Sequence, residues 1–477
     1  MVSPVIFWFR RDLRLGDNRA LVEAARRGDG LVAPVFVIDP ALASQAGPAR
    51  RAYLEATLAD LATSLEGSLI MRVGDPAVEL VDLAATIGAR EVVATDDVAP
   101  AGRRRDERVR AALASHGVAL HLLDSPYAVR PGTVTTKSGT PCKVFTPFRR
   151  VWEQIEVPAP TPAPSGVTWV EAEGATTIAL SARYALTPPP YFGDVSEEPP
   201  RFDRRTGETG AHATLGEFLA RVEDYADTRN LPGVAGTSRL SAHLRFGTIH
   251  PRQVLAAVGS ASPGAEVFRS EICWREFYAD VLWHQPESTW RVLQPAMEHL
   301  RVDRDAAAVD RFQRWARGET GYPLVDAGMR QLLEEGWMHN RVRMVCASFL
   351  IKHLHLDWRW GAKWFMWCLI DGDVASNQHG WQWTAGTGTD ASPFHRIFNP
   401  TLQAERFDPE GAYVHRYVPE LRDVAAPQCL QPGGGDGLLA PVGYVAPMID
   451  AATERNEALA RFAEARQLAA ASSGENA

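Results

Sequence analysis

The sequence predicts an α/β N-terminal domain with a doubly wound, parallel five-stranded sheet, followed by an all-α C-terminal domain. Three observations lead to this fold class. In the first part of the chain, short runs rich in Val, Ile and Leu alternate with helix-like stretches, as in parallel sheets with helices on both faces. Beyond residue 206, apolar residues recur at helical spacing instead. A stretch rich in Pro and Gly separates the two patterns.

Five buried strands are expected in the first domain, which we place at residues 1–125. They lie at residues 5–9, 31–38, 69–73, 91–95 and 118–123, with helices at 19–27, 49–65, 76–87 and 103–116. Ligands of such sheets bind beyond the carboxyl ends of the strands, which here carry Arg10, Asp39 and Asp97. No GxGxxG motif follows the first strand, so a conventional dinucleotide site is not expected.

Residues 126–205 are expected to form a long connector at the surface, because Pro and Gly punctuate them and helical spacing is lost. The second domain is placed at residues 206–468. Its predicted helices lie at 214–225, 252–258, 267–282, 306–316, 324–334, 341–355 and 362–369. Residues 431–437 are a predicted loop, and residues 469–477 are expected to be a flexible end.

The composition indicates a soluble globular protein. A chain of 477 residues is too long for one compact core, and 45% hydrophobic and 23% charged residues are ordinary fractions. No apolar run reaches the length of a membrane span. The five cysteines are scattered without a CxxC pair, which favours a reducing cytoplasm. The net charge of −8 argues weakly against nucleic acid, although local patches decide affinity for phosphates.

The stretch from residue 357 to 406 has the most unusual composition. Six of the 14 Trp residues lie in it, around Asp371, Asp373 and Asn377. Indoles are large and need a partner for the N–H, so this mixture suits a planar ligand with polar edges. A Trp-rich helical core with a polar loop is the alternative. No metal is expected, because two carboxylates are too few ligands; they could instead pair with Arg343 or bind the edge of a heterocycle.

Two further stretches suggest binding. Residues 237–241 (TSRLS) precede a helix, where hydroxyl and N–H groups could hold a phosphate, although a helix cap made by Thr237 or Ser238 would explain them equally well. Glu271, Trp274 and Tyr278 share one helix face with Arg275. A face that carries a carboxylate and an indole is a good pocket wall, while an exposed ion pair of Glu271 with Arg275 is the alternative.

The helix that follows residue 339 carries a local excess of positive charge. Asn340, Arg341 and Met344 can share one side of it, while Arg343 points elsewhere. Basic side chains beside aromatic ones are the combination that holds the bases and backbone of unstacked nucleic acid. A solvated basic face is the alternative.

Six motifs, in this order, carry a resemblance to a known family. They are WFRRDLRLGDN at 8–18, GTSRLSAHLRFG at 236–247, WREFY at 274–278, TGYPLVDAGMRQLLEEGWMHNRVRM at 320–344, DGDVASNQHGWQW at 371–383 and RIFNP at 396–400. The chain resembles the photolyase/cryptochrome flavoproteins, and among them the microbial (class I) cyclobutane pyrimidine dimer photolyases. The resemblance runs over nearly the whole chain and implies an N-terminal antenna-chromophore domain and a C-terminal helical domain that binds FAD and DNA.

The resemblance implies FAD, reduced in the active state, as the cofactor. Its contacts on matching positions are Tyr225, Thr237, Ser238, Arg239, Leu240, Ser241, Phe268, Arg343, Asp371, Gly372, Asp373 and Asn377. Asn377 would lie beside flavin N5, where an amide does not compete for the proton. Trp381 and Trp358 would pass electrons to the flavin, while the third Trp of this chain in the family falls on Asp305.

The resemblance also implies UV-damaged DNA as the partner. The matching positions are Arg229, Glu271, Trp274, Tyr278, Asn340, Arg341, Met344, Trp383 and Gln403. Photolyases are themselves a known example of base flipping, and aromatic walls such as Trp274 and Trp383 suit a flipped dimer. Glu271 would hydrogen-bond the thymine edge and stabilise the radical anion. Asn340 and Met344 favour cyclobutane dimers, because enzymes for (6-4) photoproducts carry histidines in this segment.

A second, light-harvesting chromophore is implied as well. Pro100, Ala101 and Gly102 precede the RRRD segment, where folate-binding members carry a Glu. The pattern is more similar to members that bind 8-hydroxy-5-deazaflavin than to those that bind methenyltetrahydrofolate, with Arg10, Asp39 and Asp97 as contacts.

Light-dependent repair of cyclobutane pyrimidine dimers by a cytoplasmic monomer is the expected function, with an electron passing from photoexcited reduced FAD to the flipped-out dimer. A cryptochrome-type blue-light receptor without repair activity is the alternative. The chain ends soon after its last predicted helix, whereas a long disordered tail would favour signalling. A cofactor-free α/β protein with a helical partner domain is the third possibility.

Overall fold

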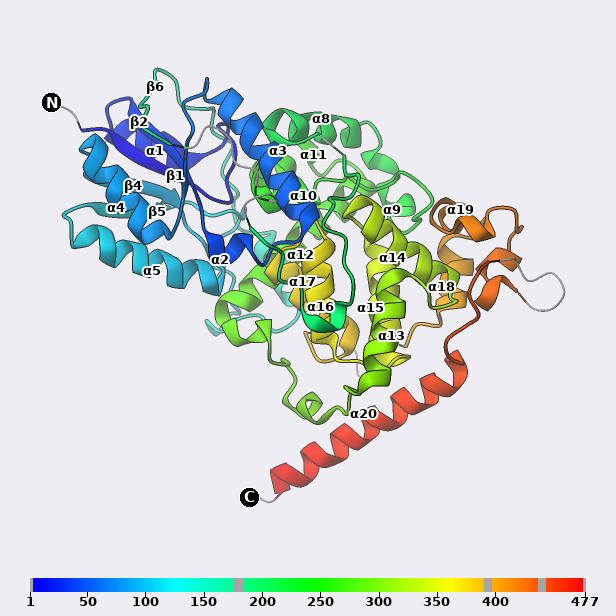
Figure 1. Ribbon diagram of the computed structural model, residues 1–477. Helices are drawn as coiled ribbons and strands as arrows, with labels where there is room; N and C mark the ends of the chain where they lie inside the picture. The colour runs from blue at the N-terminus through cyan, green and yellow to red at the C-terminus, as the bar shows by residue number, and fades with distance from the viewer. Residues whose placement is uncertain are drawn as a thin grey trace. The chain divides into compact units, whose positions relative to one another are not determined.

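The computed structural model describes residues 3–174, 180, 184–203, 205–389, 397–435 and 443–474. The chain forms two compact units, whose elements are labelled in Figure 1. Unit 1 consists of Met1–Thr187, Asp203–Glu223 and Ser238–Pro286; unit 2 consists of Pro188–Phe202, Asp224–Thr237 and Glu287–Ala477. This division differs from the predicted boundaries at residues 125 and 205, which stay a prediction about functional domains.

The sheet of unit 1 has the predicted parallel, doubly wound arrangement. Its strands β1 (Val5–Phe9), β2 (Leu31–Ile38), β3 (Ile70–Val73), β4 (Glu91–Thr95) and β5 (Ala119–Leu123) follow the order β3-β2-β1-β4-β5. Every pairing is parallel. A short sixth strand, β6 (Thr168–Trp169), pairs with the start of β2 and was not predicted. The strand order reverses at β1, so the carboxyl ends of β1 and β4 meet at the switch point.

Helices cover the sheet as its apolar pattern requires. They are α1 (Arg19–Arg27), α2 (Pro40–Ala43), α3 (Pro48–Ser64), α4 (Pro76–Ile87) and α5 (Pro100–Ala114). Leu80 and Leu83 of α4 and Leu113 of α5 pack with Ile6 and Trp8 in one buried cluster. Right-handed crossovers place helices on opposite faces when the strand order reverses, so α1 belongs on the other face.

The predicted connector contains structure that the sequence did not reveal. Helix α6 (Phe145–Trp152) lies within it, and Phe148 and Trp152 are buried. The Trp152 indole N–H donates to Glu276 over 2.7 Å, at a position far along the chain. Helix α6 has only eight residues and contains Pro147, so its apolar residues show no clear helical period. The sequence therefore did not predict it.

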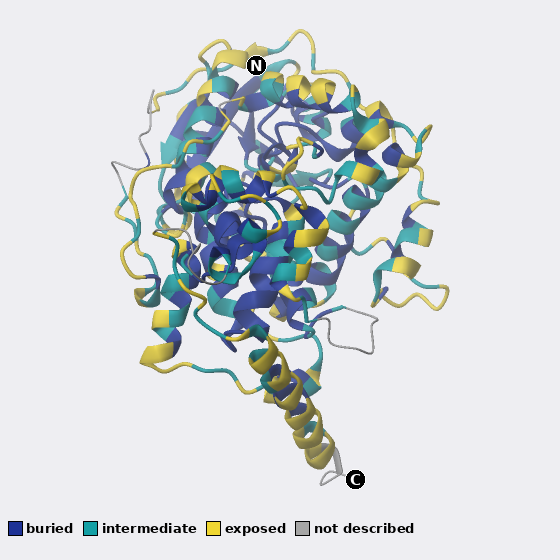
Figure 2. Ribbon diagram, turned by 90° about the vertical axis from the view of Figure 1, so that its right-hand side faces the viewer, coloured by how far each residue is buried: buried dark blue, intermediate teal, exposed yellow. Residues whose placement is uncertain are grey.

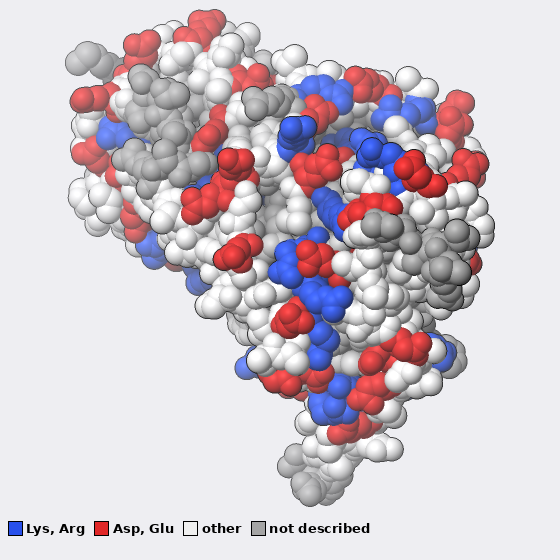
Figure 3. Space-filling model, turned by 45° about the vertical axis from the view of Figure 1, so that its right-hand side comes forward, with Lys and Arg blue, Asp and Glu red and all other residues white. Residues whose placement is uncertain are grey.

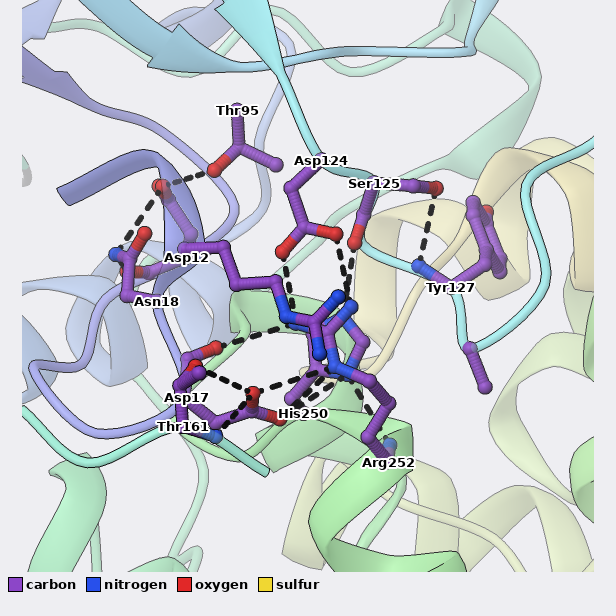
Figure 4. Close-up of polar contacts among 12 residues, drawn as sticks. Asp12, Asp17, Asn18, Thr95, Asp124, Ser125, Tyr127, Thr161, His250 and Arg252 are labelled. Carbon is purple, nitrogen blue, oxygen red and sulfur yellow. Dashed lines mark hydrogen bonds and ion pairs between the residues drawn. The ribbon is translucent and has the colours of Figure 1, made fainter. Parts of the chain in front are cut away.

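The remaining helices of unit 1 are α8 (Gly207–Leu219), α10 (Ser241–Phe246), α11 (Pro251–Val258) and α12 (Pro263–His284). The predicted helix at 214–225 begins at Gly207 and ends at Leu219. A buried polar network joins α11 to the sheet (Figure 4). Arg252 donates to Asp124 over 2.8 and 2.7 Å and to Asp17 over 3.2 Å. His250 contacts the carbonyl oxygen of Ser125 at 2.8 Å. These contacts explain why α11 belongs to the same unit as the sheet.

Unit 2 is helical, as predicted. Its helices are α9 (Tyr225–Thr228), α13 (Ala306–Arg317), α14 (Pro323–Glu335), α15 (Asn340–Lys352), α16 (Trp358–Cys368), α17 (Val374–Ala385), α18 (Pro400–Phe407), α19 (Ala412–Tyr417) and α20 (Ala451–Gly474). The predicted helix at 341–355 ends at Lys352, and the chain then turns through His355, which has a left-handed φ of 56°. Helices α17, α18 and α19 were not predicted.

Helix α20 continues to Gly474, into the end that was predicted to be flexible. Phe462 and Ala465 of this helix pack with Met297 in a small separate core, and much of the helix is exposed (Figure 2). In the part of the chain that the structure describes, no helix is long and apolar enough to cross a membrane.

Candidate functional site

The predicted pocket wall lies on α12 in unit 1. Glu271, Trp274 and Tyr278 fall on one face of this 22-residue helix, which begins at Pro263 after the N-cap Ser262. Phe145 stacks on Trp274 with ring centroids 3.6 Å apart and planes at 7°. One face of the indole is therefore covered, and its other face is the one available to a ligand. Phe145 was missed because it lies in the predicted connector.

Arg275 does not form the alternative ion pair with Glu271. Its guanidinium donates to the carbonyl oxygens of Pro126 at 3.2 Å and Leu244 at 3.1 Å. It also lies 4.3 Å above the ring of Tyr127. Arg275 thus ties α12 to its surroundings instead of pairing with Glu271.

The segment before α10 does not have the ordinary helix cap that was the alternative reading. The N-cap residue is Leu240, which has no side-chain capping bond, while the Ser238 hydroxyl accepts from the Leu240 N–H at 3.3 Å. Arg239 has a φ of 57°, a conformation that costs a non-glycine residue about 1 kcal/mol or more. Such strain is often kept where backbone groups serve a ligand. Phe268 of α12 is buried against Phe218, with centroids 4.5 Å apart.

Arg343 and Asp371 form a bidentate pair in unit 2. The two distances are 3.2 and 2.9 Å, and the Asp371 side chain is only 3% exposed. The Arg343 Nε donates to the Met338 carbonyl oxygen at 2.8 Å, which fixes the plane of the guanidinium. The pairing left open by the sequence is therefore made by Asp371. Asp373 is buried and caps α17 by accepting from the Ser376 N–H at 3.2 Å.

Asn377 on α17 has one polar atom to offer a ligand. Its Nδ2 donates to the Ala362 carbonyl oxygen at 3.0 Å and to Gln378 Oε1 at 2.8 Å. Both partners are acceptors, so the orientation of the amide is determined. Among the described residues the Oδ1 atom has no donor, and it can therefore accept a hydrogen bond from a heterocyclic N–H.

Trp381 lies against the backbone of α16. A Cβ atom at Gly361 would be 2.1 Å from the Trp381 ring, so a glycine is needed at this crossing. Trp381 also contacts Phe365 and Trp315, with centroid distances of 4.9 and 6.2 Å. Its indole N–H and that of Trp358 are buried without a partner among the described residues.

Asp305, at the third position of the expected tryptophan chain, has a structural role. Its carboxylate caps α13 by accepting from the Ala308 N–H at 2.8 Å. Among the nearby aromatics, Trp360 is half-buried and stacks on Tyr191 with centroids 4.6 Å apart. Trp364 and Trp367 are buried and pack against Phe192, which fits the core role that their spacing also allowed.

The predicted DNA contacts of unit 2 come from several helices. Arg341 donates to Asn230 Oδ1 at 2.8 Å and lies 4.5 Å above the Phe407 ring, so its head is oriented from two sides. Asn230 was not singled out by the sequence, although it adjoins Arg229. Asn340 is exposed; Arg229, Met344, Trp383 and Gln403 are half-buried, and Tyr225 is buried. Basic and acidic side chains are interspersed on the face drawn in Figure 3.

The three candidate antenna residues lie at strand ends of unit 1. Arg10 and Asp97 belong to an ion cluster with Arg105 and Asp106: Arg10 contacts Asp106 at 2.5 Å, and Arg105 contacts Asp97 at 3.2 Å. Burial would raise the pKa of Asp97, but the neighbouring arginines outweigh it and lower that pKa. Asp39 caps α2 by accepting from the Ala41 N–H. The predicted residues thus fall into an antenna group, an α10–α12 group and a group in unit 2.

Comparisons with known proteins all match this chain to DNA photolyases. A family model described as DNA photolyase matches residues 5–165, and one described as FAD binding domain of DNA photolyase matches residues 268–464. The deoxyribodipyrimidine photo-lyase of Agrobacterium fabrum is 39% identical over 486 residues, which cover 98% of either chain.

Solved structures agree with these matches. A bacterial class III photolyase from Agrobacterium tumefaciens is 38% identical, with a TM-score of 0.85 and coverage of 98% of either chain. A cryptochrome from Synechocystis is 28% identical, with a TM-score of 0.82, and the match covers 96% of this chain and 98% of that one.

Proposed function

From the premise that the chain belongs to the DNA photolyase family, we propose that it repairs cyclobutane pyrimidine dimers in UV-damaged DNA, driven by light. The observation that carries this proposal is the match, over nearly the whole chain, to a relative named for the reaction. Asn340 and Met344 support the cyclobutane dimer as the substrate, because enzymes for (6-4) photoproducts carry histidines in the matching segment.

The chemistry of the unit 2 residues fits FAD. When bound and reduced, FAD supplies the electron that splits the dimer. Reduced flavin carries a proton on N5, and Asn377 Oδ1 is an acceptor with no donor among the described residues. The Arg343–Asp371 pair sets a cation and a carboxylate beside each other without net charge. On matching positions, Tyr225, Thr237, Ser238, Leu240 and Ser241 would complete the cofactor contacts, with Arg239, Phe268, Gly372 and Asp373.

The α12 face would serve the damaged bases. The free face of Trp274 offers a flat apolar wall, and Glu271 and Tyr278 lie on the same side of the helix. A carboxyl group there can hydrogen-bond the N–H edge of thymine, which orients the dimer and stabilises charge that develops on it. On matching positions Trp383 would also contact the dimer, and Arg229, Arg341 and Gln403 would bind the strand around it.

Two accessory roles follow from the same resemblance. Trp381 and Trp358 would pass electrons inward to restore the reduced state of the flavin. Asp305 would not be the outer member of this electron-transfer chain, because its carboxylate caps a helix. The antenna would be 8-hydroxy-5-deazaflavin near Arg10, Asp39 and Asp97. Support for it comes from the motif alone, because Arg10 and Asp97 already pair within their own cluster.

A cytoplasmic monomer is the proposed state of the protein. All five cysteines are buried and free, which suits a reducing compartment. The cryptochrome reading is kept as the second candidate, because a cryptochrome is similar over 96% of this chain.

Light-dependent repair of a thymine-dimer oligonucleotide tests the proposal. We expect repair under near-UV or blue light and none in darkness. Glu271→Ala and Trp274→Ala should each lower dimer affinity or repair yield while the flavin absorbance is retained. Bound flavin without light-dependent repair would favour the cryptochrome reading instead, and unchanged repair in both variants would refute the pocket assignment.

A further inference from the structure

Several stretches of this acidic chain contain basic but no acidic residues, among them residues 125–152, 228–265 and 336–356. Residues 125–152 carry five Lys and Arg residues and no Asp or Glu, in a protein with a net charge of −8. This stretch lies within the predicted connector, and nothing in the proposed function uses it. Its composition is that of a surface for an anionic partner rather than of a neutral linker.

Many contacts hold this stretch along α12, and four of them show its course. The Gly132 N–H donates to Asp280 at 2.7 Å, and the Val129 N–H and the Trp152 indole donate to Glu276 at 3.0 and 2.7 Å. Phe145 stacks on Trp274 at 3.6 Å. The contacted residues of α12 span positions 274 to 280, which is the same stretch that carries the proposed pocket face.

The stretch borders the pocket face rather than covering it. At 100° per residue, Glu276 and Asp280 lie on the side of α12 opposite to Glu271 and Tyr278, whereas Trp274 lies on the pocket side with the latter two. Because Phe145 stacks on Trp274 of the pocket face, the residues just before Phe145 lie next to that face.

Two lysines in this bordering stretch have no acidic partner. Arg130 pairs with Asp96 and Arg149 with Glu153, each at 2.6 Å. Lys137 and Lys143, in contrast, are exposed and make no ion pair with any described residue. Lys143 is two residues before Phe145, so its Cα lies within about 8 Å of the Cα of that ring.

A rigid turn presents Lys137. Thr135 pairs with Pro141, and the Thr136 N–H donates to the Thr140 carbonyl oxygen at 2.8 Å. The Thr136 hydroxyl lies 2.8 Å from that of Thr140, and Gly139 supplies the positive φ of 78° that closes the turn. Holding a lysine in a formed turn reduces the entropy lost when it binds an anion.

We propose that Lys137 and Lys143 bind DNA phosphates beside the damaged bases, so that residues 132–145 form a backbone-binding border of the pocket. The inference rests on the proposed function for the identity of the partner. A lysine acts on phosphate as a point charge and carries no sequence information. The border therefore adds affinity for DNA in general, while the α12 face selects the dimer.

The expected magnitude follows from counterion release. Each phosphate contact on duplex DNA contributes about 0.9 to the slope of log affinity against log salt. Over the tenfold range from about 1 M to about 0.1 M salt, one contact is therefore worth about eightfold in affinity.

Dark binding of duplex oligonucleotides with and without a thymine dimer, measured by fluorescence anisotropy over a range of salt, tests this proposal. Lys137→Gln and Lys143→Gln should each weaken binding about eightfold at about 0.1 M salt and lower the slope by about 0.9, equally for both duplexes. Lys143→Arg should restore the slope, because it restores the charge.

Arg150→Gln is the matched control. Arg150 is exposed on α6 without an ion-pair partner among the described residues, but it lies about 140° around the helix from Phe145. It should leave the slope unchanged. An unchanged slope in the double lysine variant would overturn the border, as would a loss confined to the damaged duplex. A wild-type protein without preference for the damaged duplex would instead refute the proposed function, and the undamaged duplex would still report on the lysines.

Discussion

The crossing of α16 and α17 offers a sharp test of the structure through Gly361→Ala. The added Cβ would lie 2.1 Å from Cη2 of Trp381, 2.5 Å from Cζ3 and 2.8 Å from Cζ2. Ordinary contact begins at 3.4 Å, so the indole or the helix must shift by about 1.3 Å. The rings of Phe365 and Trp315 also contact the indole, which leaves it little room to move.

Two effects of opposite sign determine the stability of this variant. Replacing a helical Gly by Ala stabilises a protein by about 1 kcal/mol, because it reduces the entropy of the unfolded chain. Overpacking a core costs about 1–3 kcal/mol. Gly380→Ala on α17 has the first effect without the second, since no atom lies within 4 Å of its added Cβ. We expect the Gly361 variant to be less stable than the Gly380 variant by about 1–3 kcal/mol.

Urea unfolding followed by far-UV circular dichroism measures this difference, and near-UV dichroism reports the displaced indole. The same substitution in a Trp381→Phe variant tests whether the clash with Trp381 is the cause. The clashing ring of the indole is absent in that variant, so Gly361→Ala should stabilise it as much as Gly380→Ala does. Equal stabilisation by both glycine variants in the wild-type background would show that Trp381 does not lie against α16.

Three further predictions address buried groups. Arg252→Met leaves the buried Asp17 and the half-buried Asp124 without this arginine and should destabilise by about 3–5 kcal/mol in urea unfolding, whereas Arg110→Met, in an exposed pair, should change stability by less than about 1 kcal/mol. Burial lowers the pKa of His379 to about 4, so the unfolded chain binds more protons below about pH 6.5. Stability should therefore decrease as the pH falls from about 6.5 to about 4, and His379→Gln should make the decrease of the urea midpoint over that range smaller. Asn377→Asp sets a carboxylate oxygen against the Ala362 carbonyl and should cost about 1–3 kcal/mol, with a lower ratio of flavin to protein absorbance; an unchanged ratio would contradict the assignment of Asn377.

Local patterns predicted the elements of the sheet closely. Three strands have the predicted bounds, and the other two differ by one residue at the start. Continuous apolar runs of this length, set between amphipathic helices, leave few other folds open. The helix face of Glu271, Trp274 and Tyr278 was predicted equally well, because residues at these spacings share a side in any α-helix.

Short or Pro-interrupted elements were missed for a physical reason. Helix α6 contains Pro147, and α18 and α19 are no longer than eight residues. Isolated helices of this length are unstable, so their formation depends on packing rather than on their own sequence. Phe145 was missed with α6, and the border of the pocket with it.

The sequence by itself determined the fold class, the family and the residue types of the site, because periodicity and motifs are properties of neighbours along the chain. It left open whether Asp371 or Asp373 pairs with Arg343, and whether Glu271 pairs with Arg275. Only the tertiary structure decided these partners: Asp371 takes Arg343, while Arg275 turns to backbone carbonyls. Most buried polar atoms have a hydrogen-bond partner, and which one it is depends on residues distant in sequence that folding brings within about 3 Å.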